Sequence, residues 1–350
     1  MTGVSLAQIR LARAFSARGF PVDFFIGAVA DDVVLPSIDG VRFIRNKKAR
    51  AASMLVPIIK YFRREKPDIV FSAEDHLNII VALAAFVVKS SAKISASSRI
   101  TASRVYSKSA GLKGLVLKLF NSLSLYRIDV PTCVSKDLAT EYRALFNTEK
   151  YQCFYNIIQD VPSLKRMEDE VIDPWFNNCS VPIVVAAGTL TKRKGFDDLI
   201  NAFAIVVRER PAKLAILGEG YQRGALQALI DQLDLNESVR LLGFQSNPLK
   251  YFAKSDIFVL SSYAEGLPNV LVEAMMCGCS PVATDCPTGP REVLLNGAVG
   301  HLIPMHDPGA MASAIIASID NPVSKCRLMQ VIEPFSEDVV VASHRAALGF

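Results

Sequence analysis

Short apolar runs alternate along the chain with longer amphipathic segments. Runs such as Pro182–Ala186 and Lys213–Leu217 are typical of strands buried on both faces. The segments between them, such as Phe196–Arg208, follow the period of a helix. Because strand and helix alternate along most of the chain, the pattern predicts an α/β fold with parallel sheets. The expected strands are residues 22–26, 41–44, 68–72, 94–96, 129–134, 182–186, 213–217, 239–242, 256–261 and 281–283, and the expected helices are 4–17, 52–64, 79–88, 112–125, 196–208, 222–233, 268–277 and 309–319.

The alternation fails once, between Asn156 and Asn178, where a charged run and Asp173-Pro174-Trp175-Phe176 replace it. A chain of 350 residues is long enough for two domains. We therefore expect a first domain over 1–155, a linker over 156–180 and a second domain over 181–330. Residues 331–350 should contain the last helix.

The first domain begins in an unusual way. In a doubly wound domain, the helix at 4–17 should follow a first strand and a glycine-rich loop, but only Gly3 precedes it. Two explanations remain open: residues upstream of Met1 are missing, or the domain lacks a central strand. We favour the first.

Residues 255–294 form the most informative stretch, which is expected to run strand, loop, helix, strand, loop, helix. Pro268 suits a helix's first turn and Gly278 suits its end. Glu265 closes the loop before this helix, and Glu273 follows eight residues later. A helix start is a ready anion site, so a molecule with a phosphate and sugar hydroxyls would fit between the two carboxylates.

This stretch resembles the paired-glutamate signature of retaining glycosyltransferases with the GT-B fold, in particular glycosyltransferase family 4. Glu265-Gly266-Leu267-Pro268-Asn269 and the later Glu273-Ala274 match that pattern, and Asp285 and Thr288-Gly289-Pro290-Arg291-Glu292 follow it. The ordinary alternative is a βαβ unit with solvated glutamates, which the surrounding frame makes the weaker reading. The resemblance implies two Rossmann-like domains that face a cleft, with the last helix packing back on the first domain.

The turn Gly188–Gly195 resembles the family's glycine–arginine–leucine…lysine–glycine turn, whose cations bind the donor diphosphate. Lys194-Gly195 matches, but Thr189 stands where the family usually has arginine. Lys194 alone, or together with Lys192 or Arg193, would then have to neutralise the leaving diphosphate. By itself the turn could equally be a strand-to-helix connection with solvated basic residues.

The resemblance implies a role for each matching position. Lys194 and Glu265 are the expected catalytic residues, with Glu273 accepting a hydrogen bond from the donor ribose. The sequence contains no DxD triplet, and neither a metal nor a further cofactor is expected, because lysine and the helix dipole would replace a cation. The expected donor-binding residues are Gly188, Thr189, Arg193, Phe244, Gly266, Leu267, Pro268, Asn269 and Glu273.

The first domain is expected to bind the acceptor. His76 is a candidate because it follows a strand, although a surface histidine is an equal alternative. Many relatives have a histidine after the strand near Ile94, whereas this chain has Arg99. We expect His301, His306 and His344 to be surface or hydrogen-bonded histidines.

Charge is distributed unevenly along the chain. Residues 1–150 contain 23 Lys and Arg and 12 Asp and Glu, whereas residues 151–350 contain 16 and 22. A basic first half favours an anionic partner, but no aromatic-interleaved basic motif points to nucleic acid. The helix at Leu112–Leu125 could lie on an anionic membrane, although a core-facing helix with a solvated basic face is the simpler interpretation of the helix by itself. The basic charge of the first domain favours the membrane.

The chain shows no secretory start, and its longest apolar run is too short to span a bilayer. Its seven cysteines have neither metal-ligand nor paired spacing, and Cys277 and Cys279 read as buried free thiols. We expect a cytoplasmic protein that associates peripherally with the inner face of the cell membrane.

Together these features predict a retaining hexosyltransferase that uses a nucleoside diphosphate sugar. Its acceptor would be a sugar or a lipid-linked sugar, in polysaccharide, lipopolysaccharide or glycolipid biosynthesis. Two alternatives remain open: a GT-B sugar-nucleotide epimerase, and a non-catalytic relative that binds nucleotide-sugar.

Overall fold

The computed structural model describes residues 3–27, 35–46, 51–106, 111–177 and 180–350. The chain divides into two compact units, each with its own parallel sheet or sheets. Unit 1 comprises Met1–Ile157 and Glu337–Phe350, and unit 2 comprises Ile158–Ser336. The linker expected over 156–180 contains helix α7, Val161–Met167, which belongs to unit 2.

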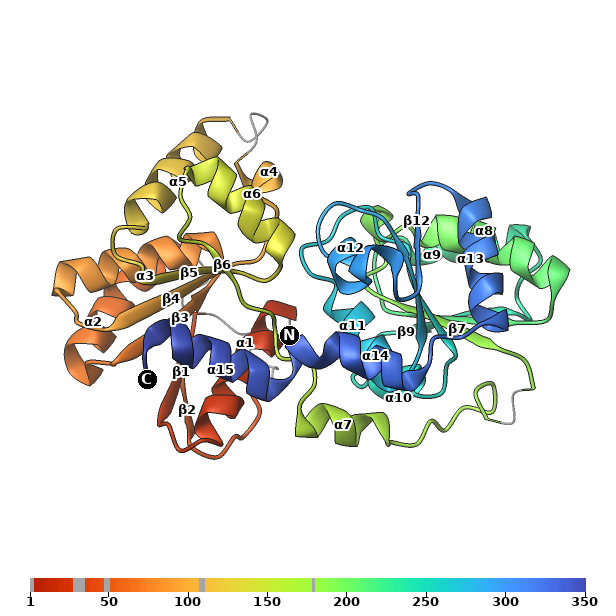
Figure 1. The fold of residues 1–350 in the computed structure, drawn as a ribbon, viewed down its shortest axis with the longest axis horizontal. Helices are drawn as coiled ribbons and strands as arrows, with labels where there is room; N and C mark the ends of the chain where they lie inside the picture. Colours follow the sequence, from red (N-terminus) through yellow and green to blue (C-terminus); the bar gives the residue numbers. More distant parts are fainter. Residues whose placement is uncertain (1–2, 28–34, 47–50, 107–110, 178–179) are drawn as a thin grey trace. The chain divides into compact units, whose positions relative to one another are not determined.

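Unit 2 (Figure 1) is built on a six-stranded parallel sheet. The strand order is β12-β11-β10-β7-β8-β9. Its central strands are short apolar segments that are buried along their length, as expected for strands covered on both faces. The strands are β7 Ile183–Ala187, β8 Lys213–Leu217, β9 Val239–Gly243, β10 Ile257–Leu260, β11 Ser280–Thr284 and β12 His301–Ile303.

The helices of unit 2 cover this sheet and bury a continuous apolar core against it. Leu199 and Phe203 of α8 and Ile315 of α13 are fully buried in this core. The remaining helices are η3 Lys192–Lys194, α8 Phe196–Glu209, α9 Arg223–Gln232, α10 Leu249–Phe252, α11 Asn269–Cys277, α12 Pro290–Val293, η4 Leu295–Gly297, α13 Pro308–Asp320, α14 Lys325–Ile332 and η5 Glu333–Phe335.

The strand order of unit 2 reverses between β7 and β10. The chain runs outward from β7 through β8 to β9, and then returns to β10 on the other side of β7. At such a switch point the loops after the two strands diverge to opposite faces of the sheet, which leaves a crevice where ligands of α/β proteins bind. The loops after β7 and β10 therefore mark the expected binding edge of this unit.

Unit 1 contains two separate parallel sheets. A two-stranded sheet pairs β1 with β2, and a four-stranded sheet has the order β3-β4-β5-β6. Among the described residues no strand bridges β1 and β3. The strands are β1 Val22–Ile26, β2 Val41–Arg45, β3 Ile69–Ala73, β4 Lys93–Ser98, β5 Val130–Cys133 and β6 Gln152–Cys153.

The last helix of the chain belongs to unit 1. Phe15 of α1 stacks on Phe71 of β3, and Val340 and Val341 of α15 join the same apolar cluster. Arg18 donates a 2.6 Å hydrogen bond to the Glu337 carboxylate at the start of α15. The helices of unit 1 are α1 Gly3–Ser16, η1 Ala51–Met54, α2 Leu55–Glu65, α3 Asp75–Val88, α4 Ala102–Val105, α5 Gly111–Ser124, α6 Lys136–Phe146 and α15 Glu337–Leu348.

A buried carboxylate ties the carboxyl end of β3 to the segments after β4. Asp75 is 6% exposed and accepts hydrogen bonds from Ser98 at 2.5 Å, Tyr106 at 2.6 Å and Tyr142 at 2.7 Å. Burial raises the pKa of Tyr106 and Tyr142 far above the usual range, and the Asp75 charge raises it further, so both phenols stay protonated as donors. These bonds explain why α3 already begins at Asp75, in what the sequence suggested was a loop.

Removing this carboxylate should destabilise unit 1. We expect Asp75→Ala to lower the free energy of unfolding by about 3 kcal/mol, because buried hydroxyls lose their acceptor. Asp75→Asn keeps one acceptor oxygen and should lose less. Denaturant unfolding followed by circular dichroism checks this, with Glu149→Ala, whose side chain is 93% exposed, as a control expected to change little. Equal stability of Asp75→Ala and wild type would contradict the role given to this carboxylate.

Candidate active site

The two residues that the sequence assigns to catalysis lie in direct contact. Lys194 comes from the loop after β7 and Glu265 from the loop after β10, on either side of the switch point. Lys194 Nζ donates to Glu265 Oε1 at 2.6 Å, and the two side chains are only 12% and 11% exposed. Two residues that are 71 positions apart in the sequence are therefore joined by one charge-assisted hydrogen bond.

The turn at Gly195 places this lysine. Gly195 has φ +60°, and a Cβ there would overlap the carbonyl oxygen of Ser261 at the end of β10. Ser261 Oγ also donates to the Lys194 carbonyl at 2.7 Å. Glycine is needed because both the conformation and the close approach exclude a side chain. The two loops are therefore held together by backbone contact as well as by the ion pair.

The stem of Lys194 lies across Gly188. A Cβ at position 188 would sit 3.2 Å from Lys194 Cε, which is closer than ordinary van der Waals contact. The first glycine of the turn thus leaves room for the aliphatic part of the lysine. Thr189, the residue that replaces the family's arginine, is exposed.

A second cation reaches the same carboxylate. Arg193 Nη1 lies 3.6 Å from Glu265 Oε2 and also donates to the carbonyl of Ala264. Lys192, which the sequence left as an alternative, is exposed, and its amide donates to the Tyr221 hydroxyl at 3.3 Å. The local cluster therefore combines two cations with one carboxylate, and Arg193 rather than Lys192 is the second cation.

The remaining donor-side positions surround this cluster or extend from it. The loop Glu265–Pro268 leads into α11, which begins at Asn269, and Thr288 donates from its hydroxyl to the Glu265 carbonyl. Glu273 lies on the second turn of α11 and is half-buried. Gly266 and Leu267 lie within the same loop and are half-buried. The structure thus brings both glutamates onto one loop-and-helix unit after β10.

Phe244 follows β9 and is 74% exposed. Glu219, in the loop after β8, forms an ion pair with Arg223 at 2.9 Å, and its carboxylate lies close to Gly243. The sequence interpretation did not assign a role to Glu219. Its position in a loop after a parallel strand is the signal that could have identified it.

A further cluster that the sequence did not reveal lies beside the loop after β10. Tyr263 donates to Asp198 at 2.8 Å, and the ring of His306 lies 4.0 Å from the Tyr263 ring between centroids. His306 Nδ1 is also 3.5 Å from Asp198, so this histidine is partnered, although its side chain is 66% exposed. No local sequence pattern connects these three positions.

Comparison with protein families identifies this part of the chain. Residues 168–331 match the model of the glycosyl transferases group 1. The match contains Lys194, Glu265 and Glu273, together with all six strands of unit 2. This stretch is similar to the glycosyl transferases group 1.

Curated relatives extend the similarity beyond this domain. An uncharacterized glycosyltransferase of Methanocaldococcus jannaschii is 30% identical over 248 residues, which are 68% of this chain and 60% of that protein. The N-acetylgalactosamine-N,N'-diacetylbacillosaminyl-diphospho-undecaprenol 4-alpha-N-acetylgalactosaminyltransferase of Campylobacter jejuni is 33% identical over 225 residues, 63% of this chain and 59% of that protein. The chain spans about three fifths of the length of these relatives.

Solved structures establish the fold of both units. Sucrose-phosphate synthase from Thermosynechococcus elongatus matches 99% of this chain and 92% of its own, with a TM-score of 0.78 and 16% identity. Anabaena HepE in complex with UDP matches 99% of this chain and 96% of its own, with a TM-score of 0.74 and 17% identity. The predicted α/β fold of the GT-B type, with parallel sheets in two domains, is confirmed.

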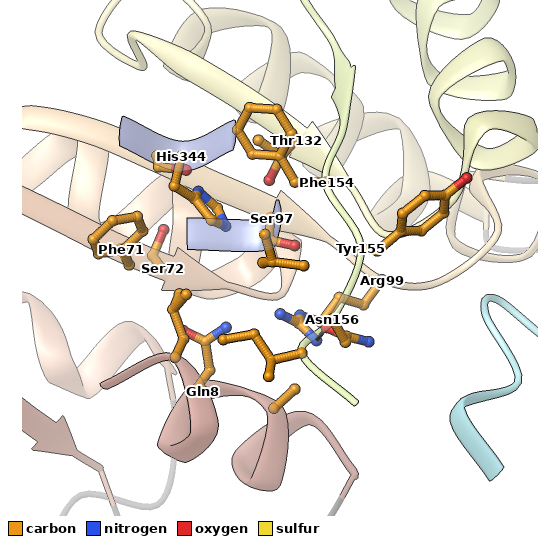
Figure 2. Close-up of a pocket in the computed structure, with 15 residues that line it drawn as sticks. Gln8, Phe71, Ser72, Ser97, Arg99, Thr132, Phe154, Tyr155, Asn156 and His344 are labelled. Carbon is orange, nitrogen blue, oxygen red and sulfur yellow. Dashed lines mark hydrogen bonds between the residues drawn. The ribbon is translucent and has the colours of Figure 1, made fainter. Parts of the chain in front are cut away.

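Outside the group 1 domain, the two acceptor-side candidates occupy different surroundings. His76 lies in the first turn of α3 and is exposed. Arg99 follows β4 and lines a small cavity of unit 1, about 20 Å³ in volume, which His76 does not line. Figure 2 shows Arg99 beside Asn156, whose side-chain oxygen accepts from Arg99 Nη1 at 2.8 Å. Acceptor binding by either residue stays a prediction.

Arg99 and His344 each have a buried side-chain nitrogen that lacks a hydrogen-bond partner. Arg99 Nε and His344 Nδ1 are buried and form no hydrogen bond. Burial lowers the pKa of Arg99 to about 10 and that of His344 to about 4, where the Arg99 charge acts in the same direction. His344, expected to be exposed or hydrogen-bonded, is instead 7% exposed between the rings of Phe71 and Phe154 (Figure 2).

This buried histidine should make unit 1 sensitive to acid. The unfolded chain binds a proton at His344 below about pH 6.5, whereas the folded unit resists it until about pH 4. The free energy of unfolding should therefore fall by about 3 kcal/mol as the pH drops through this window. Hydrogen exchange of the α15 amides, measured as a function of pH, checks this.

His344→Gln removes the titrating group and should flatten that pH dependence. His76→Gln is the matched control, because the His76 side chain stays in water in both states. A His344→Gln profile as steep as that of wild type would show that the acid sensitivity arises elsewhere.

Proposed function

We propose that the chain is a retaining glycosyltransferase that moves a hexose from a nucleoside diphosphate sugar to a sugar or lipid-linked sugar. The observation that carries this proposal is the contact of Lys194 with Glu265 at the switch point of the group 1 domain. A cation and a carboxylate at a ligand-binding edge suit a donor that contains both a diphosphate and a sugar.

The cluster is suited to a diphosphate because its charges do not cancel. Arg193 and Lys194 supply two positive charges and Glu265 supplies one negative charge. A bound diphosphate would compete with Glu265 for both cations, which would free the carboxylate to accept hydrogen bonds from sugar hydroxyls. The Arg193 guanidinium would thereby supply the charge that Thr189 cannot.

The chemical step follows from these assignments. The bond between the anomeric carbon and the diphosphate oxygen breaks, and a new bond forms to the acceptor oxygen on the same face of the sugar. The acceptor's proton passes to the departing phosphate oxygen, so no separate protein base is required. Lys194 and Arg193 would stabilise the charge that develops on this leaving group. Glu273 would accept a hydrogen bond from the donor ribose.

The relatives indicate the setting. HepE was solved with UDP, and the Campylobacter relative is named for a diphospho-undecaprenol acceptor. Other relatives are named for lipopolysaccharide core and amylovoran biosynthesis. We therefore include polysaccharide or lipopolysaccharide assembly, acceptor binding by unit 1, and peripheral association with the inner face of the cell membrane in the proposal.

The ion pair gives a sharp binding test. Lys194→Ala should weaken UDP binding by about 10-fold to 100-fold, because it removes a cation and leaves Glu265 to repel the diphosphate. Glu265→Gln should instead tighten UDP binding, by up to about tenfold, because it releases Lys194 and Arg193 from a competing charge. Isothermal titration calorimetry measures both changes.

Lys192→Ala is the matched control, because this exposed lysine lies in the same turn but does not reach Glu265. Weaker UDP binding by Glu265→Gln would refute the competition between carboxylate and diphosphate. If Lys192→Ala and Lys194→Ala lost equal UDP affinity, the loss would arise from the overall positive charge of the turn and not from the contact of Lys194 with Glu265.

Catalysis is tested by nucleotide release from UDP-, GDP- and ADP-sugars, with and without membrane lipid extract. Release should depend on the extract, persist in EDTA because two side-chain cations serve the leaving group, and fall at least about 100-fold in Lys194→Ala and Glu273→Ala. Interconversion of free nucleotide-sugars without an acceptor would indicate an epimerase. Binding without release for any donor would indicate a non-catalytic protein.

A further inference from the structure

Helix α5 of unit 1 presents its apolar side chains to solvent. Six large apolar residues recur along it at the spacing of a single helix face, and each is at least 44% exposed. They are Leu112, Leu115, Val116, Leu119, Phe120 and Leu123. A helix that only covered a core would bury this stripe, so its exposure requires an explanation.

The opposite face of α5 is small and polar, and it is this face that is buried. Gly114, Asn121 and Ser124 are buried. Asn121 donates to the hydroxyl of Tyr151 at 3.1 Å, and Ser124 donates to the Asn121 carbonyl at 2.7 Å. The polar face of the helix therefore packs against unit 1, and the apolar stripe on the opposite face is exposed to solvent.

The neighbouring helix enlarges this surface. Helices α3 and α5 pack against each other (Figure 1). Helix α3 exposes Leu83, Phe86 and Val87 at helical spacing. Phe86 alone is 71% exposed. We call the six residues of α5 and these three of α3 the α3–α5 apolar face.

After Asp75, the sequence that forms α3 and α5 contains charged side chains of only one sign. The 53 residues between Asp75 and Asp129 contain eight Lys and Arg and no Asp or Glu. Lys89 ends α3 and is exposed, and Lys118 lies on α5. An apolar stripe within a purely basic segment complements a surface that is apolar inside and anionic outside.

We propose that the α3–α5 apolar face docks unit 1 onto an anionic lipid bilayer. Helix α5 has 14 residues, a length of about 21 Å, so it would lie in the plane of the interface rather than cross the bilayer. None of the described helices is both long enough and apolar enough to span a membrane. The leucines and phenylalanines would enter the acyl boundary while the lysines contact lipid phosphates.

This inference deepens the membrane association included in the proposed function by naming the surface responsible. It would bring the enzyme to the place where a lipid-linked acceptor resides. Its test measures lipid binding without substrates, so failure of the docking surface and failure of the proposed transferase activity remain distinguishable.

Vesicle flotation with the full chain tests the proposal. The wild type should bind vesicles of phosphatidylcholine mixed with phosphatidylglycerol, and should bind pure phosphatidylcholine far more weakly. The variant L115Q/L119Q/L123Q should lose at least about tenfold in affinity, because three inserted side chains become polar. K89Q/K118Q should lose about fivefold per lysine and show a weaker dependence on salt.

The matched control is V161Q/I172Q, which makes the same kind of change at two exposed apolar residues of unit 2 and should bind as wild type does. Because every substituted leucine is exposed, circular dichroism and the unfolding midpoint should be unchanged in the triple variant. Failure of the wild type to bind the anionic vesicles, or full binding by the triple variant, would overturn the proposal. Dimerisation that the triple variant abolishes, without lipid binding, would replace the bilayer with a second copy.

Discussion

The hydrogen bond between Lys194 and Glu265 is the interaction on which the candidate site depends. Both side chains are nearly buried, so each charge would be costly without the other. Their meeting requires β7 and β10 to be neighbours, which the reversed strand order provides. It also requires glycine at 195, because a side chain there would overlap the backbone after β10. The apolar core, the sheet order and one left-handed residue thus combine to place a single ion pair.

Under the proposed function, this dependence would explain how the site tolerates Thr189. What a diphosphate needs is positive charge at a point in space, and a turn offers several positions from which a long side chain can reach that point. Arg193 lies within the 3₁₀ helix η3, next to Lys194, and reaches the second oxygen of Glu265. The loss of an arginine from one sequence position is therefore weak evidence for loss of function. The charge of the cluster is the better criterion.

Much of the fold could be predicted from the sequence because it rests on local signals. Buried apolar runs and helical periods gave the parallel α/β class. The contacts of the site were less accessible. Two features of the sites depend on packing between segments far apart in the chain. One is which basic residue of the 192–194 turn reaches Glu265. The other is the burial of His344 in a cavity with Arg99. No periodicity contains that information.

Helix α5 shows the same limit in another form. Its sequence reveals an apolar stripe but not the direction in which the stripe points, and a core-facing helix is the simpler interpretation of the helix by itself. The direction is set by Asn121, whose amide reaches Tyr151 and so draws the polar face inward. Because the Asn121 face of α5 is buried, the six apolar side chains of the opposite face stay in water. This arrangement contributes little to the stability of an isolated domain. It would become favourable if the stripe left water at a bilayer surface, as proposed, and the lysines of this part of the sequence would favour an anionic surface.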